Sequence, residues 1–370
     1  MDAIAAFDLT KEYGGTPALL GLNLQIPQGE AFACVGEKGC GKTTLVRLLS
    51  GLTRPTAGEC TVLGLSPAHE PQKLHTVAGT VLGHAKLYTD MTLYENLRFF
   101  AGLHGMDDND SLERSSFLLH KLDIWEARDM VVEDLPTGVL RRASLARALM
   151  HRPQVLLVDE PSGGLDLEAA DAIRELLSCV GEEEGVTLFL CSSNMAFAQV
   201  LCHGFAILRQ GMLLARGSLE TLRKGAGVGF RARLRLTENS PAPVGFLRVE
   251  DAWEKEIESR EDMPKIITQA IQDGLQLYEA QLVQPTLREI YAAWLEGGRK
   301  KVTQEDGTTD EVPDETPEDG ELWMEEPSEG VSEEEFYGEE DSGEVPDGED
   351  ASGESAEEEL PGEGTPGEEI

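Results

Sequence analysis

The sequence predicts an α/β domain built on a mainly parallel sheet, and two observations support this fold class. First, residues 1–222 alternate short apolar runs with segments of helical periodicity, as α/β domains do. Three runs are continuous enough for strands buried on both faces of a sheet: 31–35, 155–158 and 186–190. Second, the first run leads through a glycine-rich loop into a helical segment at 44–49. A strand–loop–helix unit of this kind predicts a phosphate-binding site at one edge of the sheet.

A second, smaller α+β unit is expected at residues 225–298. Two segments alternate like strands, the first with an exposed basic face: 230–236 and 275–283. A helix is expected over 285–296, opened by a capping box of Thr286 and Glu289. Its apolar residues recur at helical spacing and should face a core: Leu287, Ile290, Tyr291, Trp294 and Leu295.

Residues 299–370 form the third part of the chain. They are rich in Glu, Asp, Gly, Pro and Ser, and they are predicted to be disordered because they cannot bury enough apolar surface to offset chain entropy. Residues 301–370 contain 29 acidic residues and one basic residue, so they carry −28 of the net charge of −38. We favour a solubilising role for this tail. The alternative is a docking or cation-buffering segment, with contacts through its aromatic residues: Trp323, Phe336 and Tyr337.

Composition argues against several classes of protein. No apolar run approaches the roughly 18–20 residues that span a bilayer, and the N-terminal residues show no secretion signal. The six cysteines have no Cys-x-x-Cys spacing, which favours reduced thiols in a cytosolic protein. The first 300 residues carry a net charge of −10, which argues against non-specific binding of nucleic acid.

The glycine-rich loop fits the phosphate-binding pattern GxxxxGK[ST]. Its glycines let backbone N–H groups turn toward an anion, and the following helix N-terminus favours a phosphate. Lys42 can bring positive charge to the β- and γ-phosphates of a nucleotide, and the Thr43 hydroxyl can coordinate Mg²⁺. Cys40 is interpreted as a small residue tolerated in the loop, with a redox switch as the alternative. The predicted nucleotide-binding residues are Gly36, Glu37, Lys38, Gly39, Cys40, Gly41, Lys42, Thr43 and Thr44.

The run at 155–158 ends in Asp159 and Glu160, which supply the second half of the same predicted site. An aspartate at the end of an apolar strand places a carboxylate near the metal, and the adjacent glutamate can polarise an attacking water. Downstream of an intact phosphate loop, this pair predicts Asp159 as a Mg²⁺ ligand together with Thr43, and Glu160 as the catalytic residue.

With these motifs in this order, residues 1–222 resemble the ATP-binding cassette (ABC) family from end to end. The segment 9–15 is similar to the family's opening segment, and this implies that Tyr13 stacks on adenine. Three further segments resemble the start of the helical subdomain, the signature with its helix, and the contact with the opposite subunit: 92–102, 135–149 and 160–166. Residues 230–298 resemble the accessory C-terminal region of drug- and polysaccharide-export ATPases. The resemblance implies an ABC ATPase fold, with an antiparallel β-subdomain and a helical subdomain, that binds ATP and Mg²⁺.

Three positions depart from the family's pattern. Gly83 stands where the family usually has a glutamine that touches the metal and the attacking water, and the neighbouring His84 is either a substitute or an ordinary loop residue. Pro136 and Thr137 interrupt the signature, so a hydroxyl that meets the partner's γ-phosphate and a backbone donor are lost. Ser193 falls where the family has a histidine that holds the γ-phosphate and the attacking water. By resemblance, the residues at the subunit contact are Pro136, Thr137, Gly138, Gly164 and Asp166.

These departures predict that ATP binding is preserved and turnover is impaired, because losing a positioned group of this kind costs about 10²–10³ in rate. The leading interpretation is an ATP-binding subunit of an ABC transporter, an exporter, that binds and slowly hydrolyses ATP to drive a separate membrane-spanning permease. Its second ATPase subunit is either itself or a more standard sister, and its expected location is the cytoplasmic face of the cell membrane. The alternative is an ATP-binding regulatory or assembly protein that does not drive transport. A role in handling nucleic acid is disfavoured, since no basic stripe or second cassette is present.

Overall fold

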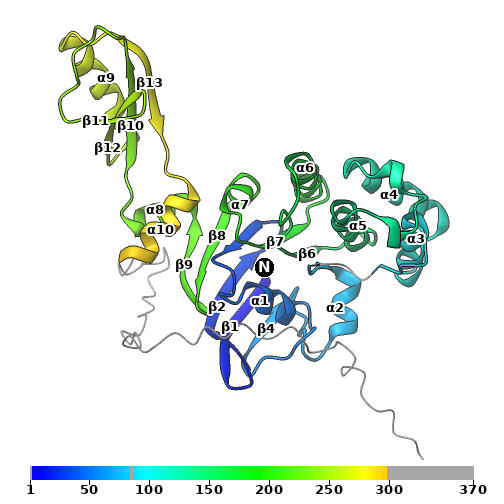
Figure 1. Cartoon of the computed structure of the whole chain (residues 1–370). Coiled ribbons are helices and arrows are strands. Elements are labelled where there is room, and N and C mark those ends of the chain that lie inside the picture. The colour runs from blue at the N-terminus through cyan, green and yellow to red at the C-terminus, as the bar shows by residue number, and fades with distance from the viewer. Residues whose placement is uncertain (1, 84–86, 298–370) are drawn as a thin grey trace, which may run out of the picture. The chain divides into compact units, whose positions relative to one another are not determined.

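The computed structural model describes residues 2–83 and 87–297 (Figure 1). Its central feature is a six-stranded sheet in the order β5-β6-β7-β3-β8-β9. The strands are β3 (Ala31–Val35), β5 (Ala78–Val81), β6 (Val155–Asp159), β7 (Thr187–Ser192), β8 (Gly204–Arg209) and β9 (Met212–Ser218). All neighbouring pairs are parallel except β8 and β9. The predicted α/β class and mainly parallel sheet are confirmed.

The inner strands β3, β6 and β7 are largely apolar because side chains from both of their faces are buried. In β3, Ala33 and Val35 enter one core cluster, while Phe32 and Cys34 enter another on the opposite face. This period of two follows from the alternation of side chains along a strand. Continuous apolar runs are therefore what a sheet covered on both faces requires.

A three-stranded antiparallel sheet, ordered β2-β1-β4, packs on the second of these clusters. It consists of β1 (Asp2–Tyr13), β2 (Thr16–Pro27) and β4 (Ala57–Val62). The apolar face of α1 (Lys42–Leu49) contributes Leu45, Val46 and Leu49 to the same cluster. The antiparallel sheet and the parallel sheet thus enclose the helix that follows the phosphate loop.

The other helices of the cassette are α2 (Pro71–Val77), α3 (Leu93–Leu103), α4 (Asp108–Lys121), α5 (Thr137–Leu149), α6 (Leu167–Glu183), α7 (Met195–Leu201) and α8 (Leu219–Ala226). Helices α3, α4 and α5 pack on one another and form the helical subdomain (Figure 1). Helix α3 starts with a capping box of Thr92 and Glu95. The amide of buried Asn96 bonds the backbone of Tyr88 and Thr92, which fixes the approach to this helix.

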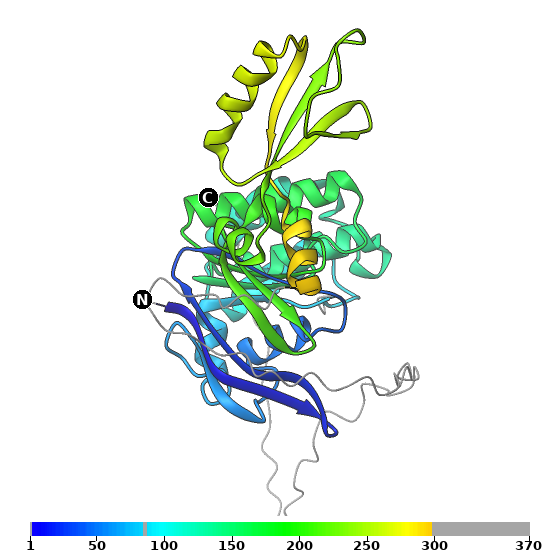
Figure 2. The ribbon, with the colours of Figure 1, turned by 90° about the vertical axis from the view of Figure 1, so that its left-hand side faces the viewer.

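A four-stranded antiparallel sheet, ordered β11-β12-β10-β13, follows the cassette. Its elements are β10 (Phe230–Leu236), β11 (Leu247–Val249), β12 (Ala252–Ile257), α9 (Met263–Gln272) and β13 (Leu277–Val283). Figure 2 shows α9 along one face of this sheet, where the two share a small apolar cluster. The described strand β13 starts two residues later than the predicted segment.

The last described helix, α10 (Leu287–Gly297), packs against α7 and α8. The predicted capping box is confirmed, since Thr286 and Glu289 exchange hydrogen bonds. The indole Nε1 of Trp294 donates to the Leu222 carbonyl at 3.1 Å. The expected apolar face joins the core: Leu287, Ile290, Tyr291 and Trp294 are buried, and Leu295 packs partly buried beside them.

The polar face predicted for residues 230–236 stays partly exposed but is not purely basic, since the side chains of Arg231, Arg233 and Arg235 are 26–39% exposed and pair with acidic groups. These acidic groups come from β12, β13 and α10. Arg231 lies 2.7 Å from Glu289, and Arg235 lies 2.8 Å from Glu279. Sequence alternation identifies the polar face of a strand but does not reveal the side chains that its neighbours place across from it.

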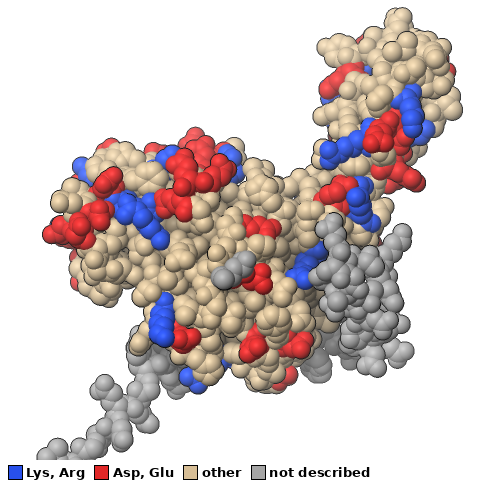
Figure 3. All heavy atoms as spheres, turned by 180° about the vertical axis from the view of Figure 1, so that it is seen from behind, with Lys and Arg blue, Asp and Glu red and all other residues tan. Residues whose placement is uncertain are grey.

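Two further sequence predictions concern the whole chain. The predicted tail, 299–370, and His84 lie outside the described residues. Among the helices that are described, none has both the length and the apolar character needed to cross a membrane. On the face shown in Figure 3, acidic and basic side chains are interspersed in small groups.

Candidate nucleotide-binding site

The phosphate loop lies between β3 and α1, at the carboxyl edge of the parallel sheet. Gly41, the N-cap of α1, has a φ of 108°, a conformation that side chains strain to adopt. A Cβ on Gly36 would collide with the backbone carbonyl of Leu208 on the neighbouring strand. Both glycines are therefore required by the backbone, and the loop tip, 37–39, stays exposed. Thr44 follows in the first turn of α1 and is half-buried.

Lys42 lies at the base of this loop with only 5% of its surface exposed. Its ammonium group donates to the carbonyls of Gly36 and Glu37 at 2.9 and 2.8 Å and lies 3.5 Å from the Glu160 carboxylate. Burial without these partners would be costly for a charge. The contacts hold the cation between the loop and the Glu160 carboxylate.

Cys40 is buried at the inner side of the same loop. Burial raises the pKa of its thiol, and the nearby Lys42 opposes that shift. A buried thiol that resists ionisation is a poor redox sensor. These observations favour the interpretation of Cys40 as a small packing residue.

Thr43 and Asp159 form the candidate metal site. The Thr43 hydroxyl donates to Asp159 Oδ2 at 2.6 Å, while Asp159 Oδ1 is buried without a hydrogen-bond partner among the described residues. Burial raises the pKa of Asp159, and the Thr43 hydrogen bond acts against this shift. Mg²⁺ prefers oxygen donors and is commonly held by one or two protein groups together with substrate phosphates. The hydroxyl and the unpartnered carboxylate oxygen fit that donor set.

Glu160 follows the last residue of β6 and has a left-handed backbone with φ of 47°. Such a conformation is strained for a side-chain-bearing residue and is typical of functional positions. The Glu160 carboxylate accepts hydrogen bonds from the Ser193 backbone N–H at 2.9 and 3.0 Å and from the Ser193 hydroxyl at 3.1 Å. Ser193 therefore anchors the Glu160 carboxylate.

The parallel register of the sheet explains this contact. Asp159 on β6 pairs with Cys191 on β7, so the residues that follow each strand meet. Asn194 then caps α7 by accepting from the Phe197 N–H at 3.1 Å. The sequence indicated that a histidine is missing at position 193, but it gave no sign that serine would bind Glu160.

Gly83 follows β5 and borders a small cavity next to the acid pair. The cavity has a volume of about 10 Å³, and its polar lining comes from Arg141, Asp159 and Glu160. Gly83 and apolar residues complete the lining: Val81, Leu145, Val158, Pro161 and Ile173. A Cβ on Gly83 would touch nothing within 4 Å. Gly83, which the resemblance aligns with the family's glutamine, thus shares a cavity with Asp159 of the candidate metal site.

The segments assigned by resemblance to the subunit contact lie together in this chain. Pro136 is the N-cap of α5 and provides no side-chain cap bond, and Thr137 is its first residue. A Cβ on Gly138 would lie 3.8 Å from Leu165. Asp166 has a role within the chain, since it caps α6 by accepting from the Ala169 N–H at 2.8 Å. Gly164, two residues before Asp166, has a φ of 68°.

Tyr13 and Tyr291 differ in exposure and in their expected relation to the site. Tyr13, at the end of β1, is 44% exposed, and Lys11 lies over its ring at 4.9 Å, so stacking on adenine stays a prediction. Tyr291 of α10 is buried, and its hydroxyl has no hydrogen-bond partner among the described residues. Burial first, and then the charge of Glu37 in the phosphate loop, raises the pKa of Tyr291. Sequence reasoning treated Tyr291 as a core residue and missed that it lies near the loop.

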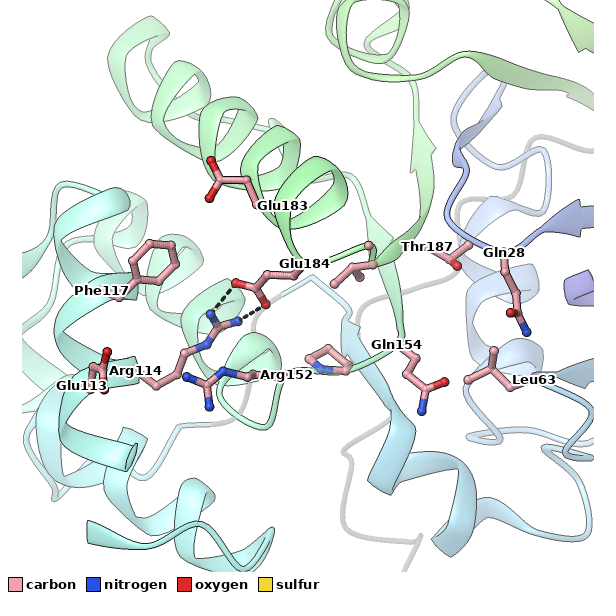
Figure 4. A pocket seen from close by; sticks show the side chains of 13 residues that line it. Gln28, Leu63, Glu113, Arg114, Phe117, Arg152, Gln154, Glu183, Glu184 and Thr187 are labelled. Carbon is pink, nitrogen blue, oxygen red and sulfur yellow. Dashed lines mark hydrogen bonds and ion pairs between the residues drawn. The ribbon is translucent and has the colours of Figure 1, made fainter. Parts of the chain in front are cut away.

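A larger cavity of about 460 Å³ lies near the other edge of the sheet, beside the first residues of β6 and β7 (Figure 4). Arg114 of α4 crosses it to bind Glu184 through two nitrogen–oxygen contacts of 2.6 and 2.9 Å. Arg114 also donates twice to the Leu149 carbonyl. This cavity shares no lining residue with the nucleotide site.

Comparison with known proteins identifies the family of the chain. The family model described as ABC transporter matches residues 19–163. The ABC transporter ATP-binding protein NatA of Bacillus subtilis is 32% identical over 206 residues, which are 55% of this chain and 83% of the relative. The linearmycin resistance ATP-binding protein LnrL of Bacillus subtilis is 27% identical over 78% of this chain and 96% of its own length. The bacitracin transport ATP-binding protein BcrA of Enterococcus faecalis is 29% identical over 59% of this chain and 70% of its own.

Solved structures give the same result for the fold. An ATP-binding subunit of an ABC transporter superposes with a TM-score of 0.57 at 25% identity, covering 61% of this chain and 93% of that one. A dimeric bacterial ABC transporter cassette superposes with a TM-score of 0.55 at 25% identity, covering 58% and 98%. The expected ABC ATPase fold is thus confirmed. The phosphate loop, the acid pair and these similarities establish that the chain belongs to the ATP-binding subunits of ABC transporters.

Proposed function

We propose that this subunit binds ATP with Mg²⁺, hydrolyses it slowly, and thereby drives a separate membrane-spanning permease that exports its substrate. One observation carries the proposal of slow turnover. The phosphate- and metal-binding side chains are assembled around Glu160, but Ser193 and Gly83 occupy the positions that would position the attacking water.

Each part of the site has an assignable task. Lys42 and the loop N–H groups bind the phosphates, and Thr43 with Asp159 holds the metal. Bound Mg²⁺ neutralises charge that develops on the phosphates. Glu160 orients the water, and its carboxylate is steadied by two donors from Ser193. Serine carries no charge, and Gly83 has no side chain, so the water is held on one side only.

The proposal of export rests on the C-terminal unit and on the relatives. The alignment with LnrL covers 78% of the chain, which is longer than the 222-residue cassette, so it extends into the C-terminal unit. The relatives include proteins named for bacitracin transport and linearmycin resistance. We infer a partner permease, a second ATPase subunit that is either a copy or a sister, and a location at the cytoplasmic face of the membrane.

The test of turnover compares the purified chain with Ser193→His and with Gly83→Gln plus Ser193→His. The proposal expects wild-type turnover well below one per second and an increase of about tenfold or more in the double variant. Glu160→Gln supplies the inactive baseline. A wild-type turnover of several per second, in the usual range for enzymes of roughly 1–10³ per second, would contradict slow hydrolysis.

The test of transport is affinity purification of the tagged chain from detergent-solubilised membranes. A co-purifying polytopic membrane protein supports the transporter assignment, and a co-purifying ATPase with standard motifs identifies the sister subunit. If no membrane protein co-purifies, the alternative of an ATP-dependent regulatory or assembly protein gains support.

A further inference from the structure

Two buried polar atoms near the acid pair have no hydrogen-bond partner among the described residues. They are Nε of Arg141, on α5, and Oδ1 of Asp159, at the end of β6. Buried polar atoms in native proteins are nearly always bonded to protein or to water. Both residues line the same cavity of about 10 Å³, and about 10–15 Å³ is enough for one water molecule.

The guanidinium group of Arg141 also lies over the turn that follows Glu160. A Cβ on Gly163 would lie 3.1 Å from Arg141 Nη1, and a Cβ on Gly164 would lie 4.0 Å from Nη2. Glycine at position 163 leaves the space that the guanidinium occupies, and glycine at position 83 leaves the cavity open. The same arginine thus contacts the metal-site cavity and the turn.

We propose that Arg141 is a positioning residue that links the start of α5 to Asp159 through one buried water and holds the turn at Gly163–Gly164. A water between a guanidinium donor and a carboxylate acceptor satisfies both orphan atoms. The turn and the start of α5 are the segments that the resemblance assigns to the subunit contact. Arg141 therefore connects the metal site of this chain to its dimer surface, an inference that builds on the proposed function.

Hydrogen exchange of the nucleotide-free chain tests this link without requiring turnover. Arg141→Met keeps an unbranched apolar stem and removes the guanidinium donors. We expect about tenfold faster exchange of the amides at 161–166, because a hydrogen bond to a charged group is lost. Asp159→Asn weakens the carboxylate acceptor of the proposed water. If the link exists, adding Arg141→Met to Asp159→Asn should therefore speed exchange of the amides at 161–166 by much less than tenfold.

Arg142→Met is the matched control on the same helix. The Arg142 guanidinium donates to the carbonyls of Leu122 and Asp123, so its loss should affect exchange near 122–124 and leave 161–166 unchanged.

Should Arg141→Met fail to fold, Gly163→Ala provides a second route, since its methyl group displaces the guanidinium and should reproduce the faster exchange. Unchanged exchange at 161–166, or equal effects of Arg141→Met in both backgrounds, would overturn the proposal. Slow or fast turnover bears only on the proposed function, so the two can fail separately.

Discussion

At the residue scale, the site depends on where single buried polar atoms find partners. Lys42 is held by two carbonyls and the Glu160 carboxylate, and Glu160 is held by Ser193. Asp159 has one oxygen bonded to Thr43 and one without a described partner. This asymmetry makes Asp159 the most informative position for mutation.

Replacing Asp159 with asparagine separates metal binding from folding. Burial raises the pKa of Asp159, so the folded state without ligand disfavours its charge, and the neutral amide removes that cost. We expect Asp159→Asn without ligand to melt within about 2 °C of wild type or above it. Wild type should gain about 2.7 kcal/mol of stability from ATP and Mg²⁺ at one hundred times the dissociation constant, whereas the variant should lose the Mg²⁺-dependent part.

Calorimetric melting with ATP alone and with ATP plus Mg²⁺ measures both effects. Thr43→Val serves as the companion variant, because it removes the other proposed metal ligand. A full Mg²⁺-dependent stabilisation of Asp159→Asn would show that the metal site is elsewhere.

At the element scale, two contacts made at the ends of the subdomain helices can be tested. One is the Arg114–Glu184 ion pair, which connects α4 to the end of α6. The other is a pair of stacked imidazoles, His104 after α3 and His151 after α5, with ring centroids 4.0 Å apart. Neither nitrogen of His151 has a hydrogen-bond partner among the described residues.

Removing Glu184 should be costly, because it leaves the buried Arg114 without its counter-charge. The Arg114 side chain is 4% exposed. Losing one partner of a buried ion pair lowers the free energy of unfolding by about 3–5 kcal/mol. Because Arg114 keeps its hydrogen bond to the Leu149 carbonyl, we expect a loss at the lower end of this range, about 3 kcal/mol. Urea unfolding of Glu184→Ala measures this, and Arg114→Met plus Glu184→Met should recover most of the loss. Asp108→Ala is the control, since it breaks the exposed Arg98–Asp108 pair and should cost at most about 1 kcal/mol. Equal effects of the two single substitutions would refute the argument.

His151 predicts sensitivity of the fold to acid. Burial, and then the adjacent His104, lowers its pKa to about 4; Arg114 and Arg147 act in the same direction. The folded state therefore binds fewer protons than the unfolded state, whose histidine titrates near 6.5. Stability should be full above about pH 6.5 and fall as the pH drops toward 4, by about 2 kcal/mol after allowance for partial exposure.

The variant His151→Phe keeps a stacked ring without a titrating group. Its unfolding free energy should lose this acid dependence, while that of His69→Asn, at an exposed position, should keep it. Parallel pH profiles for wild type and His151→Phe would assign the acid sensitivity to other groups.

At the scale of the whole molecule, the cassette and the C-terminal sheet differ in what they bury. The cassette has two apolar clusters on opposite faces of its sheet, and the C-terminal sheet has a small cluster of its own. Helix α10 contributes to the cassette's core through Trp294 and Leu287. The contacts described for the nucleotide site all lie within residues 2–297.

A chain that ends at Gly297 should therefore keep its nucleotide affinity and melt within about 2 °C of the full chain. A chain that ends at Gln284, before α10, should be less stable, because it exposes the cluster that Trp294 covers. Melting curves and binding of a fluorescent ATP analogue distinguish these outcomes. A large loss of affinity in the longer truncated chain would give the acidic tail a direct part in binding.

Features that depend on neighbours along the chain could be predicted from the sequence alone. The spacing of Gly36, Gly41 and Lys42, the buried runs, and the capping box at Thr286 each follow from local backbone and periodicity rules. The resemblance of ordered motifs also identified the family. These predictions needed no knowledge of which strands lie side by side.

Only the tertiary structure decided the contacts made by residues far apart in sequence. The register of β6 against β7 brings Ser193 to Glu160, and the packing of α5 brings Arg141 to the cavity that Asp159 lines. Neighbouring elements place acidic side chains beside the arginines of β10. Each contact arises from the pairing and packing of whole elements, whose geometry is set by burial over the entire fold. Local sequence shows that a polar group is present, but the folded chain determines which partner satisfies it.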